Sequence, residues 1–337
     1  RWRRGRRARG VHAAFLATAG RAVLATILVA SRTPIPAAAL SAARPLAAQE
    51  PPRSALSVRV GDAWHEWWRA ERAPRRWARP LDQVAGAVEW RTVRAGVELG
   101  ELRLAAGGAA GRIRAILVRL DPAAVRFALV GPVTGPGGAG RWAVQDAPAD
   151  AVVAINAGQF DSRGPWGWIV RDGVELQPPG AGPLSTAFIL DGAGTASLIA
   201  TDDIPAVRQE GRPMDQAFQS YPTLLVDDGV VPAALRREDA GVDLRHRDCR
   251  LALGVLRDGR ILIALTRFDG LGGVLAPLPF GPTTPEMAAL MGALGAQRAV
   301  LLDGGISGQL LVRDEDGATH LWEGWRRVPL GLVAFPR

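Results

Sequence analysis

The chain has 337 residues, with 41 basic side chains against 33 acidic ones and a formal net charge of +8. Nine arginines and no acidic residue lie within residues 1–49, so the rest of the chain carries 32 basic and 33 acidic side chains. The body is therefore close to neutral, which argues against a nucleic-acid partner. The single cysteine, Cys249, excludes an intrachain disulfide and a cysteine-based metal cluster.

Residues 1–49 have the composition of an export leader. A basic region, Arg1–Arg9, precedes the apolar stretches Val11–Ala19 and Ala22–Ala30, and small residues suited to signal peptidase follow. An uncleaved membrane anchor is the alternative, because the two stretches together nearly reach the ~20 residues that span a bilayer. In both cases the basic flank stays in the cytoplasm, so we expect a periplasmic or secreted body. This segment is the only membrane contact that the sequence predicts.

Residues 50–87 form a second region. It begins with a proline-containing linker, and Ser54–Leu81 then places four tryptophans (64, 67, 68 and 77) among arginines. This pattern predicts one or two amphipathic helices that lie on the domain surface.

Residues 88–337 have a different sequence pattern. Short β-type runs alternate with Gly, Pro and Asp-Gly turns, and helical periodicity is clear only at Thr284–Leu294. Shorter helices are predicted at Pro213–Gln219 and Pro232–Glu238. The pattern predicts a single α+β domain dominated by mixed or antiparallel twisted sheet, with few helices, behind the export leader.

Motifs for metals and cofactors are missing from the sequence. The chain contains no lysine, which excludes a P-loop and a Schiff base. The four histidines (12, 65, 246 and 320) have no ligand spacing such as HExxH. No metal and no cofactor are therefore predicted.

The segment that most strongly suggests a functional site is Arg298–Gln309, where an apolar run ends at Asp303-Gly304-Gly305-Ile306-Ser307. Glycines at a strand exit let the backbone approach a ligand, and Asp303 and Ser307 offer an acid and a hydroxyl. A plain hairpin turn is the alternative, because Asp-Gly is a strong turn signal and occurs seven times in this chain. Glu286, at the start of the preceding helix, is a second candidate acid. Its alternative is a capping box with Thr283.

Two further segments offer polar groups next to apolar runs. Asn156, in Ala154–Phe160, could orient a sugar hydroxyl, or it could be a turn residue at a strand exit. Trp166 or Trp168 could stack against a sugar ring, although a buried tryptophan is the more common case. Arg250 precedes the strand Leu251–Leu256, and its planar guanidinium suits a phosphate or carboxylate. A surface or paired structural arginine is the alternative.

Taken in chain order, these segments resemble the phosphodiester glycosidase family over about residues 88–337. The resemblance lies in Trp90–Val97 with Ile116–Pro122, Ala154–Phe160, Pro165–Gly173, Pro222–Gly229, Arg250–Gly254 with Asp258–Arg260, and Glu286–Ser307. Four positions depart from the family pattern: Ala157 replaces a glycine, Gln159 an aromatic residue, Leu251 a threonine and Ile306 a glycine. The Ile306 side chain, in place of a glycine, reduces the space around the backbone near Asp303.

The resemblance implies hydrolysis of a sugar-1-phosphodiester between the anomeric carbon and the phosphate, in a glycan or glycoconjugate outside the cytoplasm. Asp303 is then the first candidate for the carboxylate that acts on water or on the anomeric carbon, and Glu286 is the second. Arg250 would stabilise the phosphate leaving group. The remaining candidate binding residues are Asn156, Gly158, Trp168, Gly304, Gly305 and Ser307. A secreted glycan-binding module without catalysis, on the same scaffold, is the alternative.

Overall fold

The computed structural model describes residues 54–106, 111–132, 142–211, 213–237, 241–269 and 280–337. The predicted leader, residues 1–49, lies outside the described residues. In the part that is described, antiparallel strands dominate and helices are few, as predicted. None of the helices found there has both the length and the apolar character needed to cross a bilayer.

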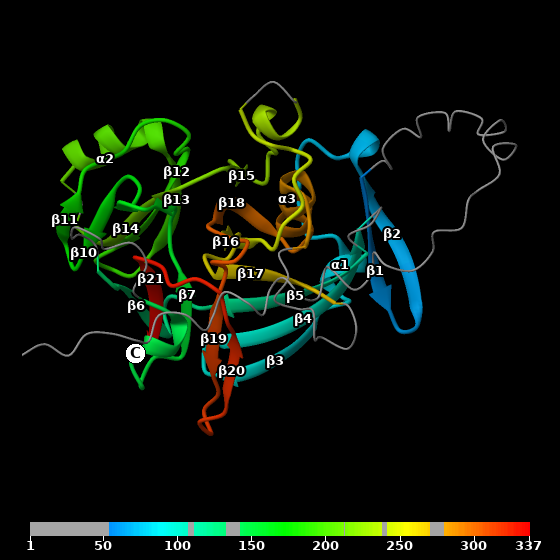
Figure 1. Cartoon of the computed structure of the whole chain (residues 1–337), viewed down its shortest axis with the longest axis horizontal. Coiled ribbons are helices and arrows are strands. Elements are labelled where there is room, and N and C mark those ends of the chain that lie inside the picture. Colours follow the sequence, from blue (N-terminus) through cyan, green and yellow to red (C-terminus); the bar gives the residue numbers. More distant parts are fainter. Residues whose placement is uncertain (1–53, 107–110, 133–141, 212, 238–240, 270–279) are drawn as a thin grey trace, which may run out of the picture. The chain divides into compact units, whose positions relative to one another are not determined.

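The largest sheet contains nine strands among the described residues, in the order β15-β18-β16-β17-β5-β4-β1-β2, with β3 paired to β4 (Figure 1). The strands are β1 (Ala55–Val60), β2 (Ala63–Arg69), β3 (Glu89–Arg94), β4 (Val97–Ala106), β5 (Arg112–Leu120), β15 (Thr223–Leu225), β16 (Leu251–Leu256), β17 (Ile261–Phe268) and β18 (Ala296–Leu302). Leu251 of β16 pairs with Leu302 of β18 and with Leu265 of β17. The first residue of β16 and the last residue of β18 therefore lie next to each other, at the same end of the strands.

Helix α3 (Thr284–Ala293) covers one face of this sheet beside β15 and β18 (Figure 1). It begins with a capping box, in which Thr283 Oγ1 accepts from the Glu286 amide and the Glu286 carboxylate accepts from the Thr283 amide. Gly295, at φ +94°, follows its end. Met287 and Leu290 pack in one buried cluster with Leu301 of β18. This confirms the helix predicted from the sequence.

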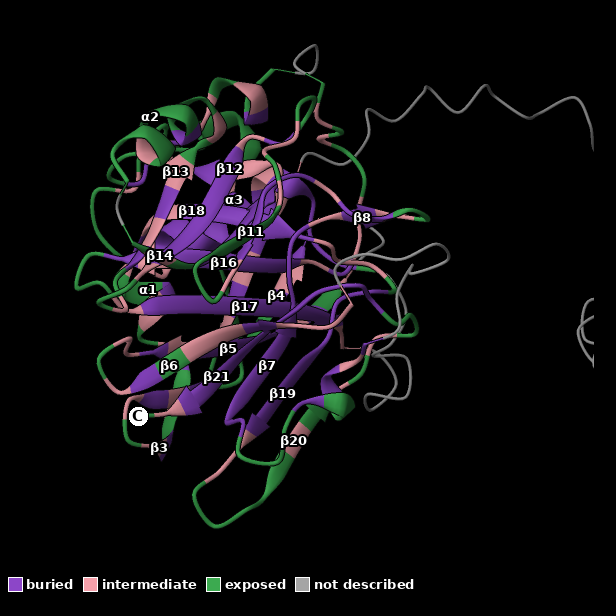
Figure 2. Cartoon of the chain, turned by 90° about the vertical axis from the view of Figure 1, so that its left-hand side faces the viewer, coloured by how far each residue is buried: buried purple, intermediate pink, exposed green. Residues whose placement is uncertain are grey.

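Two smaller sheets pack with the opposite face. One has the order β11-β10-β14-β12-β13 and the other β20-β19-β7-β21-β6. Their strands are β6 (Val125–Val130), β7 (Val153–Asn156), β10 (Ile169–Arg171), β11 (Val174–Gln177), β12 (Thr186–Asp191), β13 (Ala196–Ala200), β14 (Met214–Ser220), β19 (Leu310–Arg313), β20 (Thr319–Trp322) and β21 (Gly331–Pro336). Phe188, Phe218 and Leu332 from these sheets share a core with Leu253 and Val300. Strands β12 and β16, which contribute to this core, are almost entirely buried (Figure 2).

Helices are scarce elsewhere. Two more α-helices occur among the described residues, α1 (Asp82–Ala85) and α2 (Ile204–Gln209). A short strand pair, β8 (Phe160–Asp161) and β9 (Gly164–Pro165), follows β7 and forms a projecting hairpin.

The tryptophan-rich segment differs from the prediction. Residues 55–69 form the β1–β2 hairpin rather than an amphipathic helix, and β1 pairs with β4 at the edge of the large sheet. Leu56 and Val58 alternate with more exposed residues, and Trp68 is buried while Trp64 is exposed. The helix prediction was wrong because backbone pairing with β4, a distant segment, outweighs the local apolar pattern.

The predicted helix Pro213–Gln219 was also wrong, because residues 214–220 form the central strand β14. In the structure Gln216 accepts from the Leu129 amide at 3.1 Å and donates to Asp172 at 2.8 Å. The segment Pro232–Glu238 contains only a short 3-10 turn, Ala233–Leu235, in its described part.

Candidate functional site

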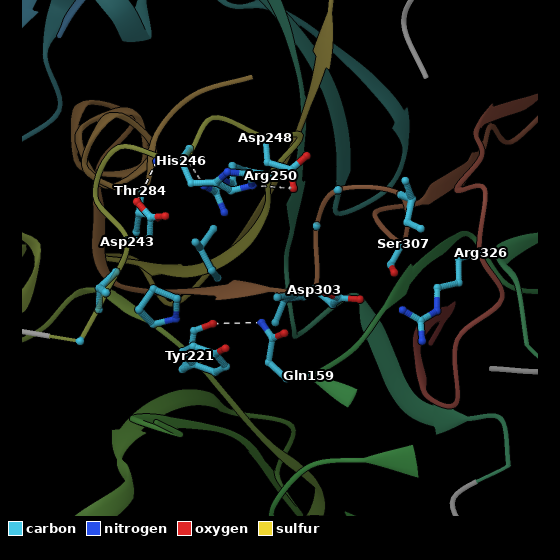
Figure 3. Close-up of a pocket in the computed structure, with 18 residues that line it drawn as sticks. Gln159, Tyr221, Asp243, His246, Asp248, Arg250, Thr284, Asp303, Ser307 and Arg326 are labelled. Atoms are coloured by element: carbon cyan, nitrogen blue, oxygen red, sulfur yellow. Dashed lines mark hydrogen bonds and ion pairs between the residues drawn. The ribbon is translucent and has the colours of Figure 1, made fainter. Parts of the chain in front are cut away.

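A cavity of about 530 Å³ opens at the end of the large sheet where β18 ends and β15 and β16 begin (Figure 3). Polar side chains dominate its wall. The lining residues that could contact a ligand through side-chain polar atoms are Gln159, Tyr221, Asp243, His246, Asp248, Arg250, Thr284, Asp303, Ser307 and Arg326. Of the residues predicted from the sequence, the cavity brings together Asp303, Arg250, Ser307, Gly304 and Gly305.

Strand register places Arg250 and Asp303 side by side. Leu251 pairs with Leu302 in the antiparallel β16–β18 pair, and Arg250 and Asp303 are the next residues outward on each strand. Arg250 and Asp303, 53 positions apart in the sequence, thus both line the same cavity, with Arg250 beside Asp248 and the Asp303 carboxylate on the side of Ser307 and Arg326 (Figure 3). They lie on the same side of the molecule, as a single catalytic cleft requires.

Asp303 is anchored through its backbone. Its amide donates to the Gly158 carbonyl at 3.1 Å, and its carbonyl accepts from Asn156 Nδ2 at 2.7 Å. Burial raises the pKa of the Asp303 carboxyl, while a hydrogen bond from Ser307 and the charge of Arg326 oppose this rise. A raised pKa makes the carboxylate a stronger base, which suits proton transfer.

Arg250 is held by two backbone carbonyls. Its Nε donates to Pro282 at 3.2 Å and its Nη2 donates to His246 at 2.7 Å. Among the described residues Nη1 has no hydrogen-bond partner, so this nitrogen remains as a donor for a ligand in the cavity. Burial lowers the pKa of Arg250, and the nearby Asp248 carboxylate opposes this effect. An arginine nevertheless stays protonated in proteins, so the cavity contains a fixed positive charge.

Asp248 is a second acid in the cavity that sequence reasoning missed. Burial raises the pKa of its carboxyl, which lies beside Arg250 and 3.5 Å from His246 Nε2. One of its oxygens accepts from the Cys249 amide at 2.8 Å. The signal was available, because Asp248 lies in the same polar run before β16 that pointed to Arg250. That the Asp248 side chain lines a cavity could not be predicted from that run.

The two glycines after Asp303 line the cavity and also allow close backbone packing. A Cβ at Gly304 would overlap with the Cys249 carbonyl, and one at Gly305 would lie 2.8 Å from Asp248 Oδ2. Gly305 also has φ +54° and donates its amide to the Cys249 carbonyl at 2.7 Å. The glycines thus let the Asp303 loop pack against the segment that carries Asp248 and Arg250.

Glu286 lies outside the cavity lining and is fully buried. Arg247 binds it through both oxygens, at 2.6 and 2.7 Å, and Ser54 Oγ donates to it at 2.5 Å. The Thr283 amide adds the capping-box bond at 2.9 Å. The structure therefore explains this glutamate by helix capping and by an ion pair.

Three other predicted residues also lie outside the cavity lining. Asn156 is fully buried, where it bonds to Asp303 and accepts from the Gln309 amide at 3.0 Å. Gly158 supports Asp303 through its carbonyl and has φ +65°. Trp168 is fully buried in the core of the β10–β14 sheet, and its indole donates to Glu175 at 2.8 Å.

Tyr221, Gln159 and Arg326 complete the cavity and were not among the predicted site residues. Gln159 Nε2 donates to the Tyr221 carbonyl at 3.0 Å, which joins two segments 62 positions apart. The Arg326 guanidinium lies 4.7 Å from the Phe160 ring centroid and contributes positive charge near Asp303. Ile306 lines the cavity and is 42% exposed.

Within the described residues, no group of three or more His, Cys, Asp or Glu side chains is arranged to hold a metal ion. Two half-buried carboxyls, Asp303 and Asp248, and two arginines line the same cavity. This combination suits a ligand that has both hydroxyls and an anionic group.

Comparisons with known proteins agree with this chemistry. The family profile described as phosphodiester glycosidase matches residues 149–335. The catalytic domain of zebrafish N-acetylglucosamine-1-phosphodiester alpha-N-acetylglucosaminidase, auto-inhibited by its pro-peptide, is similar in fold, with a TM-score of 0.51 and 19% identity. That match covers 74% of this chain and 84% of the zebrafish chain.

A hypothetical protein from Synechocystis matches with a TM-score of 0.49 and 17% identity, over 74% of this chain and 64% of that one. No curated protein matches the sequence. Because the family profile covers more than half of its residues, the chain belongs to the phosphodiester glycosidase family.

Proposed function

We propose that this protein hydrolyses a sugar-1-phosphodiester, breaking the bond between the anomeric carbon and the phosphate oxygen. The observation that carries the proposal is that Asp303 and Arg250, from neighbouring strand ends, line one cavity. The zebrafish relative is named for cleavage of such a bond in N-acetylglucosamine-1-phosphodiesters. The predicted leader would place the activity outside the cytoplasm.

The leaving group explains the charge of the cavity. A phosphate monoester is a stable anion, so it needs less protonation than an alcohol and more positive charge nearby. Arg250 provides a preorganised guanidinium with Nη1 available, and Arg326 adds charge from the other side of Asp303. The phosphate departs with the electron pair of the broken bond, and a water oxygen ends on the anomeric carbon.

Asp303 is the carboxylate that we assign to the anomeric centre, as base toward water or as nucleophile. Its backbone is fixed on both sides, by Asn156 and Gly158, so its position is set before substrate binds. We propose Asp248 in place of Glu286 as the second acid, because Asp248 lines the cavity and Glu286 is bound by Arg247. The separation of the two carboxyls in a substrate complex would then decide between inversion and retention.

The experiment that tests this function uses the p-nitrophenyl diester of N-acetylglucosamine 1-phosphate. Cleavage at the sugar releases nitrophenyl phosphate, which becomes coloured only after a phosphatase is added. Cleavage at the aryl oxygen would release nitrophenol at once and would contradict the proposal. In ¹⁸O-labelled water, anomeric attack leaves the released nitrophenyl phosphate unlabelled. A glycan-binding module without catalysis would retain the probe uncleaved.

A further inference from the structure

A second cavity, of about 490 Å³, lies beside the first on the far side of Trp166. The β8–β9 hairpin forms one wall, with Asp161, and residues 180–184 contribute to another. Gln177 and Trp166 also line it. The reaction proposed at Asp303 does not use this space.

Trp166 connects the two cavities. Its ring stacks on Tyr221, which lines the first cavity, with ring centroids 6.2 Å apart and an interplanar angle of 17°. Its amide donates to the carbonyl of Gln159, another lining residue of the first cavity, at 2.7 Å. One aromatic pair therefore forms the partition, with Tyr221 on the side of Asp303 and Trp166 on the side of the second cavity.

The Trp166 ring is held in place independently of any ligand. The Asp161 carboxylate accepts a hydrogen bond from the Trp166 side chain. Hydrogen bonds from Arg163, with a smaller contribution from Trp166, lower the pKa of Asp161 to about 2. The carboxylate is therefore ionised at any physiological pH, and its oxygens accept from the Arg163 amide at 2.7 Å and from the Arg163 guanidinium at 2.9 and 3.2 Å. Gln177 donates to the Pro165 carbonyl at 3.0 Å, and its Oε1 has no hydrogen-bond partner among the described residues.

The floor of the second cavity is built around one buried side chain. Gln219 Oε1 accepts from the Trp168 amide at 2.6 Å and from the Gly180 amide at 2.7 Å. Its Nε2 donates to Thr201 Oγ1 at 3.1 Å. Gly167 and Gly180 approach so closely that a Cβ on Gly180 would lie 2.7 Å from Gly167 Cα. These contacts tie the tryptophan loop to the opposite wall, so the cavity is preformed.

We propose that the second cavity binds a further sugar residue of the substrate, which stacks on Trp166, so that the natural substrate is a glycan chain joined to phosphate. The inference rests on the proposed function. An indole face suits the C–H face of a pyranose, and the amide oxygen of Gln177 can accept from one of its hydroxyls. A volume of this size is within the roughly 300–1,000 Å³ of small-molecule sites.

The test compares probes that differ only in extension. The parent probe is the p-nitrophenyl diester of N-acetylglucosamine 1-phosphate. One extended probe carries chitobiose in place of the single sugar. In a second, methyl glucoside replaces the nitrophenyl group on the phosphate, and in a third a decyl group replaces it. Release of the free reducing sugar is measured for all four, because two of the probes carry no nitrophenyl group. Wild type, Trp166→Ala and Trp166→Phe are assayed with all four. The two sugar probes distinguish extension on the sugar side from extension on the phosphate side.

We expect Trp166→Ala to lower kcat/KM for one sugar-extended probe by about two- to tenfold more than for the parent, through KM. Trp166→Phe keeps an aromatic face and recovers most of this difference. Trp64→Ala, on the distant β1–β2 hairpin, is the matched control and leaves all four values unchanged. Equal effects of Trp166→Ala on every probe, or an effect confined to the decyl probe, would overturn the inference.

A binding measurement separates this inference from the reaction. Saturation-transfer NMR with chitobiose and with maltotriose is recorded on wild type, Trp166→Ala and Asp303→Asn. We expect contacts that Trp166→Ala removes and Asp303→Asn retains, even if no probe is cleaved. If neither sugar shows contacts that depend on Trp166, the second cavity is not a sugar site, whatever the enzyme does to the parent probe.

Discussion

Asn156 donates a 2.7 Å hydrogen bond to the backbone carbonyl of Asp303, and the two residues are 147 positions apart. The same amide accepts from Gln309 at 3.0 Å, so both ends of the Asp303–Gln309 loop are fixed by one buried side chain. Asn156 therefore acts as a positioning residue, and its effect on the reaction passes through Asp303.

The Asn156→Asp variant tests this positioning role. An ionised carboxylate at position 156 cannot donate to the Asp303 carbonyl, whereas a protonated one can. We expect kcat to fall at neutral pH with little change in KM, by about 5- to 100-fold for a lost buried hydrogen bond of ~1–3 kcal/mol. Activity relative to wild type should recover as the pH is lowered. A pH profile parallel to that of wild type would refute the role.

Replacing Asp303 tests the central assignment. Asp303→Asn keeps the shape and the acceptor for Ser307 but removes the base or nucleophile. We expect kcat on the p-nitrophenyl probe to fall by about 10²–10⁴-fold, the usual contribution of a positioned proton-transfer group. The matched control is Asp316→Asn, which changes another Asp-Gly pair in an exposed turn. Full activity in a folded Asp303→Asn protein would exclude Asp303 from the reaction.

The same variant has a predicted effect on stability. Burial raises the pKa of Asp303 above its unfolded value of 3.8, so the folded protein binds more protons than the unfolded one. The free energy of unfolding contributed by this group is therefore greatest below pH 3.8 and decreases as the pH rises through the folded pKa. We expect Asp303→Asn to be more stable than wild type at neutral pH, with the difference shrinking in acid. Thermal unfolding at several pH values measures this, and a constant difference would contradict it.

Arg250 is predicted to act on the phosphate. Arg250→Lys retains the charge but cannot bind two backbone carbonyls and a ligand with the same planar fork. We expect kcat/KM to fall by about 10²–10³-fold, as for loss of one preorganised charge-stabilising donor. Inhibition by nitrophenyl phosphate, which resembles the leaving group, should weaken in parallel. Arg59→Lys, on the β1–β2 hairpin, is the control, and unchanged inhibition in Arg250→Lys would argue against the phosphate contact.

Glu286 should behave differently from Asp303. Glu286→Gln removes the carboxylate that binds the Arg247 guanidinium, and the Arg247 side chain is 23% exposed and partly solvated. We expect a loss of about 1–3 kcal/mol in the free energy of unfolding, less than for a fully buried pair. Activity per folded molecule should stay within severalfold of wild type. Denaturant unfolding and the phosphatase-coupled assay separate the two effects, and a loss of kcat as large as in Asp303→Asn would restore Glu286 as a catalytic candidate.

Several features of this protein could be predicted from the sequence because their causes are local. The capping box at Thr283–Glu286 and the glycine after the helix mark both ends of α3 within 13 residues. Alternating short apolar runs and turn residues predicted the sheet-rich class. Asp303 and Arg250 stood out because each interrupts an apolar run at a strand end.

The tertiary structure decided which of these groups meet. Strand register brings Arg250 to Asp303, and side-chain hydrogen bonds over 62 and 147 positions bring Gln159 to Tyr221 and Asn156 to Asp303. Such contacts depend on the closure of long loops and on which face of each strand is buried. The residues next to each position in the sequence do not determine these two features. For the same reason the sequence could not tell that Asp248 lines the cavity, that Glu286 is occupied by Arg247, or that β1 joins the large sheet as a strand.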